Sequence, residues 1–519
     1  MDFLDPKKQR AHMIRLIVGY ILLGVAVLFG TLILLYQAYG FGLGKDGEVI
    51  QKGLVFMSSQ PTRAQIYLDG MLRKDRTNTK LQLEAGQYKA ELKREGYRDW
   101  LRLITVEGGS VQHFDYPKLF PAKLVTTNIK NYTAAPAFAS QSPDRRWLVL
   151  QQPGTMITFD LFDLADPQDI AANSTTVAVQ ENLLTAARPG SQSWKLVEWS
   201  TNNRHILLQH VYTPLTNGAA ETSEYILVDR QVPTESVNLS RLLSLPSGRQ
   251  LALRDKKHDL YYVFDAAARS LATTSIDDAG KLTPLLENVL SYKPYGANMV
   301  LYVSDTEPAA EQGLTAEKPL PAGKVVTMLR DRDQTYKIRE HSAMPPYLTD
   351  MAEYGGDWYV ASGSAGDGKI NIYKNPQQIR KSSQTATLVP VHILKVDTPN
   401  KLTFSSNTEF LMASNGTQFA VYDAETDKGY RFISPHPLDP PAAHATWMDG
   451  HRITYVSEGK LKVLDYDNIN VQTLSPASPN YLPFFDRDYD TLYTLIPTVG
   501  QQAGAMTMTA TSMLIPEDQ

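Results

Sequence analysis

The chain has 519 residues, none of them cysteine, and its formal net charge is −4. The absence of cysteine excludes disulfides, thiolate nucleophiles, iron–sulfur clusters and cysteine-ligated zinc. The near-neutral charge argues against bulk nucleic-acid binding, which needs a concentrated basic field. The length predicts more than one domain, since domains typically contain about 100–200 residues.

An uncharged apolar segment at residues 16–36 is the first predicted element. It is long enough to cross about 30 Å of hydrocarbon as a helix, and it exceeds the apolar core of about 7–15 residues in a cleaved signal peptide. Four basic residues precede it, whereas two basic residues beside two acids follow: Lys7, Lys8, Arg10 and Arg15 against Lys45, Lys52, Asp46 and Glu48. The positive-inside bias predicts residues 1–15 as a cytoplasmic tail, 16–38 as a single-pass signal anchor and the rest as extracytoplasmic. Cleavage after the small residues near 38–40 is the alternative.

Residues 39–52 are predicted to form a linker, and residues 53–120 a small β-rich domain. Glycines around Lys45 give the linker a superficial likeness to a phosphate-binding loop, but no Ser or Thr follows the lysine and no strand precedes it. After Gly53, short alternating segments are separated by turns such as Asp69-Gly70. This pattern predicts a small antiparallel β-sandwich with strands near residues 54–57, 64–68, 81–83, 87–92 and 100–106.

The same segment resembles the PEGA domain, a small β-sandwich common in bacterial and archaeal envelope and surface proteins. The resemblance rests on four stretches in order: residues 58–64 (SSQPTRA), 66–70 (IYLDG), 81–88 (LQLEAGQY) and 92–97 (LKREGY). The signature tetrapeptide at residues 61–64 (PTRA) keeps the proline and the alanine but not the glycine. The resemblance implies an adhesion, interaction or spacer module and supplies no catalytic residues.

Residues 121–519 repeat a unit in which a polar turn leads into an apolar strand. The turns are centred on Asp144, Asn202, Gly248, Gly296, Gly356, Asn407, Asp449 and Asp488. A further strand often follows and ends in aspartate, at Asp163, Asp229, Asp265, Asp423 and Asp465. Repeats of about 40–50 residues with several strands each predict a β-propeller, and a stack of two β-sandwiches is the alternative.

The clearest copy, residues 142–150 (SPDRRWLVL), resembles the strand pair of WD40-like and TolB-type propeller repeats, with Arg145 where those repeats have glycine. The copies predict seven or eight blades, the last of them partial or shared between the chain ends. Two polar inserts, residues 214–224 and 307–324, are predicted as exposed loops. The predicted fold is therefore all-β: a transmembrane helix, a PEGA-like sandwich and a C-terminal propeller.

No motif assigns a catalytic, cofactor-binding or metal-binding residue. A nucleophile elbow requires Gly-x-Ser-x-Gly between a strand and a helix. The nearest stretch, residues 363–368 (GSAGDG), lies between two strand-like segments and is interpreted as a hairpin loop. Residues 486–490 (DRDYD) begin like a calcium loop, but the sixth position is Thr491 and the twelfth is Pro497. A solvated turn is therefore favoured there.

The ten histidines are scattered along the chain. His205 and His210 are five apart, which places them on opposite faces of one predicted strand. His444 and His451 flank a turn, which allows them to approach each other. Surface or internally hydrogen-bonded histidines are favoured over a metal site.

These features favour a membrane-anchored, extracytoplasmic binding or scaffold protein of a prokaryotic cell envelope, without an enzymatic role. In this hypothesis the sandwich is a spacer, and the propeller recognises an envelope protein or a glycan. The alternative is an envelope hydrolase or lyase whose carboxylates converge in the propeller's central funnel. Neither hypothesis calls for a cofactor or a nucleic-acid partner, and the sequence does not set the oligomeric state.

Overall fold

The computed structural model describes residues 6–38, 41–43, 49–153, 157–166, 169–216, 218–278, 280–308, 317–383, 386–440, 445–500 and 503–518. The chain forms two compact units: Met1–Lys123 together with Leu514–Gln519, and Leu124–Met513. The second unit is thus an insertion near the end of the first. Lys45 of the predicted linker, His444 and much of the 307–324 insert lie outside the described residues.

A single long helix, α1 (Pro6–Ala38), opens the described chain. Its segment His12–Tyr36 is strongly apolar, with none of it buried, and is long enough to cross a membrane. The hydroxyl of Thr31 donates to the Val27 carbonyl (2.8 Å), so this polar side chain is satisfied within the helix. The apolar helix predicted from the sequence is confirmed, and it fits a membrane span or a signal anchor.

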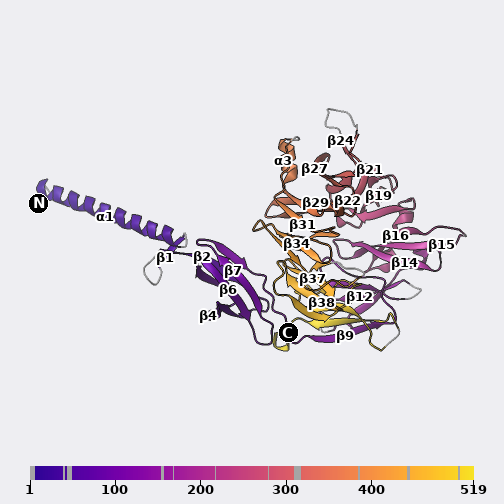
Figure 1. Ribbon diagram of the computed structural model, residues 1–519, viewed down its shortest axis with the longest axis horizontal. Helices are drawn as coiled ribbons and strands as arrows, with labels where there is room; N and C mark the ends of the chain where they lie inside the picture. Colours follow the sequence, from indigo (N-terminus) through magenta and orange to yellow (C-terminus); the bar gives the residue numbers. More distant parts are fainter. Residues whose placement is uncertain are drawn as a thin grey trace. The chain divides into compact units, whose positions relative to one another are not determined.

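The rest of the first unit is a sandwich of two four-stranded sheets (Figure 1). One sheet has the order β4 (Met71–Arg76), β3 (Gln65–Leu68), β6 (Gly86–Lys93) and β7 (Trp100–Val106). In the other, β2 (Val49–Met57) pairs with β1 (Phe41–Leu43), β5 (Thr79–Glu84) and β8 (Val111–Phe114). The sandwich is confirmed, but it is not wholly antiparallel, because β8 runs parallel to β2.

The sandwich core follows the alternation of its strands. In β7, every second side chain is buried, from Trp100 through Ile104 to Val106, whereas Leu103 between them is exposed. Burying one such side chain contributes about 1.5–3 kcal/mol. The buried face of this strand also holds Arg102, whereas Leu101 and Leu103 are exposed, so residue type alone does not identify the buried face here.

The end of the chain packs on this sandwich as a C-terminal tail, which we define as residues 514–518. Ile515 packs against the sandwich core, with its Cδ1 where a Cβ on Gly96 would be only 3.1 Å away. Gly96 has φ +79°, a left-handed conformation that glycine adopts without steric cost. The sequence leaves this tail in the C-terminal domain, since nothing in its pattern signals the return.

The second unit is built of four-stranded antiparallel sheets, numbered here in chain order (Figure 1). The first sheet is β10 (Ala139–Gln141), β11 (Trp147–Gln151), β12 (Thr158–Asp163) and β13 (Ser174–Ala178). The second is β14 (Ala187–Trp199), β15 (His205–Pro214), β16 (Thr222–Asp229) and β17 (Val237–Asn238). The third is β18 (Arg249–Leu253), β19 (Leu260–Asp265), β20 (Ser270–Ser275) and β21 (Thr283–Leu286). The fourth is β22 (Val289–Tyr295), β23 (Met299–Ser304), β26 (Lys324–Asp331) and β27 (Gln334–Ser342).

The remaining sheets continue the same pattern. The fifth is β28 (Tyr347–Tyr354), β29 (Asp357–Ser364), β30 (Lys369–Lys374) and β31 (His392–Lys395). The sixth is β32 (Lys401–Phe404), β33 (Phe410–Ser414), β34 (Gln418–Asp423) and β35 (Lys428–Ile433). The seventh is β36 (Thr446–Trp447), β37 (Arg452–Ser457), β38 (Lys460–Asp465) and β39 (Gln472–Pro476). The eighth joins β40 (Phe484–Phe485), β41 (Thr491–Pro497) and β42 (Met506–Ser512) to β9 (Val125–Tyr132), which comes from the start of the unit.

These sheets close a ring. Buried apolar clusters join each sheet to the next from the first to the sixth. Phe410 of the sixth sheet stacks on Tyr466, which follows β38 of the seventh (4.1 Å between ring centroids). Ser478, after the seventh sheet, donates its N–H to the Leu495 carbonyl of the eighth (2.8 Å). The eighth sheet packs on the first through a further cluster, so the β-propeller is confirmed and the two-sandwich stack is excluded.

The repeat turns lie between the first and second strands of their sheets in all copies but one. Gly248 instead precedes β18, the first strand of the third sheet, and Asp265 ends the second strand of that sheet rather than the third. At this copy the polar turn still leads into an apolar strand, but that strand is the first of its sheet rather than the second. The true first connection, residues 254–259, has no Ser-Pro-Asp pattern.

The clearest turn shows why its residues recur. Ser142 Oγ accepts the N–H of Trp147 (2.9 Å), and Asp144 Oδ1 accepts the N–H of Arg146 (3.1 Å). Arg145 has φ 61°, the left-handed conformation for which related repeats use glycine. The second and sixth sheets repeat the turn, with Ser200, Asn202 and Asn203, and with Ser405, Asn407 and Thr408.

Smaller elements lie in the connections between strands and in the tail. They are α2 (Leu239–Leu242), α3 (Pro376–Ser382), and the short 3-10 turns Glu181–Leu183, Pro233–Glu235, Arg254–Lys256, Ala365–Asp367 and Pro516–Asp518, the last of which lies in the tail. In the 307–324 insert, which the sequence predicts as a loop, β24 (Thr306–Pro308) pairs with β25 (Glu317–Pro319). The two ends of this insert are therefore paired strands rather than irregular chain.

Candidate functional site

A cavity of about 480 Å³ lies between the third and fourth sheets of the propeller. We call it the arginine pocket, and its lining is Arg254, Tyr262, Thr273, Leu285, Ala297, Asn298, Val300, Arg330, Arg332 and Asp333. Arg254 comes from the connection after β18, Arg330 from the end of β26, and Arg332 from the turn before β27. Strands and turns that are distant in sequence thus bring three guanidinium groups to one cavity.

One of these arginines is held rigidly by its surroundings. Arg254 Nε donates to the carbonyl of Ala297 (3.1 Å), which ties the third sheet to the turn between β22 and β23. Burial raises the pKa of the Tyr262 hydroxyl, and the hydrogen bond and charge of Arg254 act in the opposite direction. The Arg254 side chain therefore has a fixed place at the pocket wall.

The other two arginines have unused donors. Arg330 Nε is buried and has no hydrogen-bond partner among the described residues. Its Nη2 lies 3.7 Å from Asp333 Oδ1, beyond hydrogen-bond length, and the Asp333 side chain is fully exposed. Arg332 is exposed, and its side chain forms no ion pair or hydrogen bond within the described part of the chain. The pocket therefore offers donors to an anion.

The floor of the arginine pocket is apolar. Tyr262 and Val300 are almost fully buried, and Leu285 is partly buried beside them. Arg330 pairs in register with Val300 across β23 and β26, which sets the guanidinium at the edge of this floor. A ligand with a carboxylate and an aliphatic stem would find both of its parts matched here.

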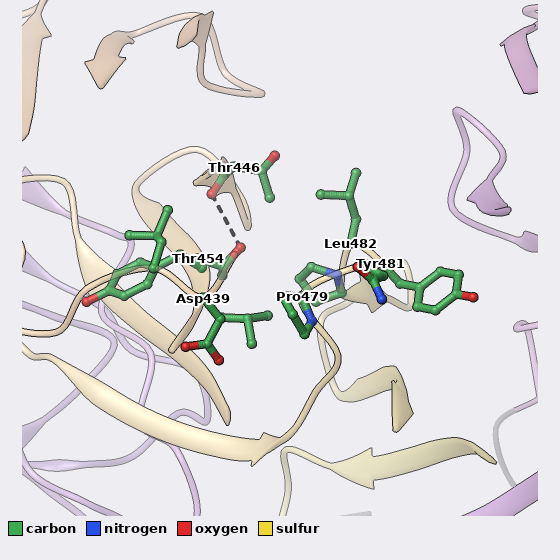
Figure 2. Close-up of a pocket in the computed structure, with 11 residues that line it drawn as sticks. Asp439, Thr446, Thr454, Pro479, Tyr481 and Leu482 are labelled. Atoms are coloured by element: carbon green, nitrogen blue, oxygen red, sulfur yellow. Dashed lines mark hydrogen bonds between the residues drawn. The ribbon is translucent and has the colours of Figure 1, made fainter. Parts of the chain in front are cut away.

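A second cavity, of about 130 Å³, lies between the seventh and eighth sheets. Figure 2 shows Asp439, Thr446 and Thr454 on one side of it and Pro479, Tyr481 and Leu482 on the other. The Asp439 carboxylate accepts the N–H groups of Glu458 (2.9 Å) and Gly459 (2.7 Å), and the Thr454 hydroxyl donates to the Thr446 carbonyl (3.3 Å). Because these polar groups are already hydrogen-bonded within the protein, the cavity has few polar groups left to bind a ligand.

A charged cluster joins the first strands of the fourth, fifth and sixth sheets, which contact one another. Lys293 Nζ lies 2.6 Å from Asp350 Oδ1, and the Tyr295 hydroxyl donates to the same carboxylate oxygen. Burial and the neighbouring Lys293 charge lower the pKa of Lys401 on β32. Asp350 is the common acceptor, so the cluster links these first strands to one another.

The motifs considered in the sequence take structural roles. Residues 363–368 comprise the last two residues of β29 and the turn that leads into its antiparallel partner β30, as the hairpin interpretation expects. Asp486 begins the turn between β40 and β41, where its Oδ1 accepts the Asp490 N–H (2.7 Å). Neither stretch lines either of the cavities described above.

The histidines of β15 lie in different environments. His205 stacks on His258 (4.2 Å between ring centroids), and burial together with that neighbour lowers the pKa of His205 to about 4. His210 is fully buried between Trp194 and Tyr212 and bonds Glu224 Oε1 through Nδ1 (2.9 Å). Burial opposes the ionisation of Glu224, but bonds from His210, Thr185 and Asn238 lower its pKa to about 2.

The carboxylates whose pKa burial raises serve backbone connections. Glu198 accepts the N–H of Leu253 (2.5 Å), and Asp423 accepts those of Glu425 and Thr426. Burial also raises the pKa of Asp486 in the turn described above. None of the three lines either cavity. Among the described residues, no three His, Asp or Glu side chains gather closely enough to hold a metal.

Sequence reasoning missed the arginine pocket. Its arginines are spread over residues 254–332, and only a tertiary structure brings them together. The one local signal is the alternation Arg330-Asp331-Arg332-Asp333 at the end of a strand. Such a run is ordinarily a solvated turn, so the sequence alone does not separate it from the rest of the surface.

The chain combines a β-propeller with a small β-sandwich, and known proteins are similar to each part. Residues 52–119 match the family model of the PEGA domain, which confirms the resemblance noted in the sequence. No curated protein is significantly similar to the chain.

Among solved structures, the C-terminal WD40 domain of Sif2 is similar, with a TM-score of 0.43 and 9% identity over 74% of this chain and 98% of that one. Kluyveromyces lactis Hsv2p has a TM-score of 0.36 and 10% identity over 66% of this chain and 98% of that one. A eukaryotic initiation factor has a TM-score of 0.38 and 10% identity, over 76% of this chain and 97% of that one.

Proposed function

We propose that this protein is a membrane-anchored binding or scaffold protein of a prokaryotic cell envelope, with the propeller as its recognition module. One chain joins an apolar helix, a PEGA domain and a closed ring, and this combination supports the proposal. The N-terminus is cytoplasmic and the two β-rich units are extracytoplasmic, in accord with the basic residues before the helix. The PEGA domain is the spacer between the anchor and the recognition module.

The single observation that carries the binding role is the arginine pocket. Arg330 Nε and the Arg332 side chain have no hydrogen-bond partner among the described residues, whereas the polar groups of the smaller cavity and of the motifs have theirs. Buried donors are ordinarily satisfied, so an open pocket with unpaired guanidinium donors favours a ligand. Function inferred from the propeller fold alone is analogy, and the pocket supplies the physical argument.

Crosslinking in intact cells tests the proposal. The full-length chain is treated with a membrane-impermeant crosslinker and purified, and we expect the same envelope protein or glycan to be recovered in independent preparations. A chain lacking residues 1–38 should yield less of that complex if anchoring matters. Failure to recover any partner, combined with turnover of envelope glycan or peptide by the purified chain, would reverse the proposal in favour of an enzyme.

A further inference from the structure

We propose that the arginine pocket binds an acidic side chain of an extended segment of a partner protein. The inference deepens the proposed binding function and rests on it. Three arginines, Arg254, Arg330 and Arg332, face one cavity, and among the described lining residues Asp333 alone is acidic. The excess positive charge selects an anion, and the planar guanidinium fork matches a carboxylate through two parallel hydrogen bonds.

The unpaired donor of Arg330 is the first step of the argument. A buried Nε–H without a partner loses its hydration and gains nothing in return. Asp333 does not satisfy it, because the closest approach between the two side chains is 3.7 Å, to Nη2, and Asp333 is fully exposed. A ligand carboxylate in the pocket would accept the hydrogen bond of Arg330 Nε–H, for which the described residues provide no acceptor.

The arrangement of the arginines is the second step. Arg254 is fixed by its bond to the Ala297 carbonyl, whereas Arg332 lies on a two-residue turn and forms no ion pair or side-chain hydrogen bond in the described part of the chain. One preorganised guanidinium and one exposed guanidinium suit capture of a ligand by the exposed arginine and its alignment by the fixed one. Rim charges of this kind steer association as well as contributing to affinity.

The apolar floor of the arginine pocket indicates the chemical class of the ligand. Tyr262, Leu285 and Val300 provide an apolar surface beneath the charges. The methylene groups of a glutamate side chain can cover this surface while the carboxylate reaches the arginines. A compact inorganic anion would leave the floor in contact with water, and a polyanionic nucleic acid is disfavoured by the chain's net charge of −4.

Fluorescence anisotropy with a labelled hexaglutamate peptide tests the proposal on the full-length protein in detergent. Labelled hexaglutamine and an oligogalacturonate of similar charge are the comparison probes, at low and at physiological salt. We expect hexaglutamate to bind and hexaglutamine not to bind. Arg332→Gln should weaken hexaglutamate binding about tenfold, with a larger loss in the Arg330→Gln and Arg332→Gln double variant. Arg332 is exposed in a turn, so its replacement leaves the core intact.

Arg431→Gln is the matched control, because Arg431 is an exposed arginine on β35 of the sixth sheet, outside the pocket lining. It should bind hexaglutamate like the unmodified protein. Equal binding by the Arg332→Gln and Arg431→Gln variants overturns the proposal, as does equal binding of hexaglutamate and hexaglutamine. Binding of oligogalacturonate without hexaglutamate also overturns it, in favour of an acidic glycan.

The two proposals fail separately. If crosslinking recovers an envelope partner from cells equally well with Arg332→Gln and with Arg431→Gln, the binding function stands and the assignment of the pocket is wrong. If hexaglutamate binds in an arginine-dependent way but no partner is recovered from cells, the pocket is a carboxylate-binding site and the proposed scaffold function is wrong.

Discussion

The Tyr97 hydroxyl donates a 2.7 Å hydrogen bond to Oδ2 of Asp518, so the last residues of the chain are bound to the PEGA domain. The same hydroxyl oxygen accepts the backbone N–H of Ile515 (3.1 Å), and Arg94 pairs with the other oxygen of Asp518. Burial raises the pKa of Tyr97 to about 12, with Asp518 acting in the same direction, so the phenol stays protonated as a donor. Gly96 and Tyr97, which close the PEGA sequence pattern, therefore form the binding site of the C-terminal tail.

Tyr97→Phe should loosen the tail without unfolding the sandwich. The substitution removes the acceptor of the Ile515 N–H and one donor to Asp518, which we expect to cost about 1–3 kcal/mol in the opening free energy of the tail. Hydrogen exchange measured by mass spectrometry should then show faster exchange at residues 514–518. Tyr88→Phe is the control, because the Tyr88 hydroxyl donates to the Glu84 carbonyl (2.9 Å) in the same domain. Equal exchange of the tail in both variants would contradict the role of Tyr97.

The sandwich and the ring were predictable from local patterns, whereas the tail and the pocket were not. Short apolar segments between polar turns identify the strands of the sandwich. The polar residues of the turn at 142–144 recur because a small polar side chain can satisfy the backbone of a tight connection. The third sheet shows the limit of this signal. At Gly248 the sequence shows a polar turn before an apolar strand. The same pattern would arise whether that strand were first or second in its sheet, so the pattern does not give the position of the strand.

Long-range relationships have no local pattern at all. Ile515 lies with Leu514 in a short segment that has no periodic pattern, and its partner Gly96 lies more than four hundred residues earlier. Arg254 and Arg330 likewise meet only because the third and fourth sheets are neighbours in the ring. A sequence reports periodicity and turn chemistry, but it does not report which surface residues the ring will bring together.

Asp160→Ala should strongly destabilise the propeller at its closure. Asp160 on β12 is almost fully buried and accepts bonds from Lys130 Nζ (2.8 Å) and the Tyr132 hydroxyl (2.8 Å), both on β9. This carboxylate therefore joins the first sheet to the strand that completes the eighth. Its loss leaves a cation and a hydroxyl unpaired, which should lower the free energy of unfolding by about 3–5 kcal/mol.

Urea unfolding of the full chain in detergent, followed by near-UV circular dichroism, measures this effect. Asp163→Ala is the comparison, because Asp163 ends the same strand and pairs with Arg146 (2.7 Å), whose side chain is half exposed. That loss should be about 1 kcal/mol. A similar loss for the two variants would argue that Asp160 has no special role in closing the ring.

The stability of the propeller should fall as the pH drops from about 6.5 to about 4. Burial lowers the pKa of His341 to about 4. Its Nδ1 faces the Ser342 carbonyl (3.2 Å) and its Nε2 faces the Thr327 hydroxyl (2.9 Å), which fits the neutral ring. The unfolded chain, with a histidine pKa near 6.5, takes up the proton first. The stabilisation is thus complete above pH 6.5 and is lost as the pH falls through that window.

His341 is 1% exposed, and the difference between its pKa in the folded and in the unfolded chain corresponds to about 3 kcal/mol of stability. The lowered pKa of His205 changes the stability with pH in the same direction. His341→Asn should be less stable at neutral pH, with a shallower decline between pH 6.5 and pH 4. Urea midpoints at pH 7, 5.5 and 4.5 compare the two proteins. Parallel declines in the variant and the unmodified protein would mean that other groups govern the acid sensitivity.

The absence of native cysteine permits a direct test of the orientation in the membrane. Arg10 is exposed near the start of α1, and Val499 is 95% exposed in the turn between β41 and β42. In intact bacterial spheroplasts, a membrane-impermeant maleimide should label Val499→Cys and should reach Arg10→Cys only after the membrane is permeabilised. This outcome is expected because four basic residues precede the helix and favour the cytoplasmic side. The unmodified chain, which has no thiol, is the blank in both conditions. Labelling of Arg10→Cys in intact spheroplasts with protection of Val499→Cys would establish the opposite orientation and would place the propeller in the cytoplasm.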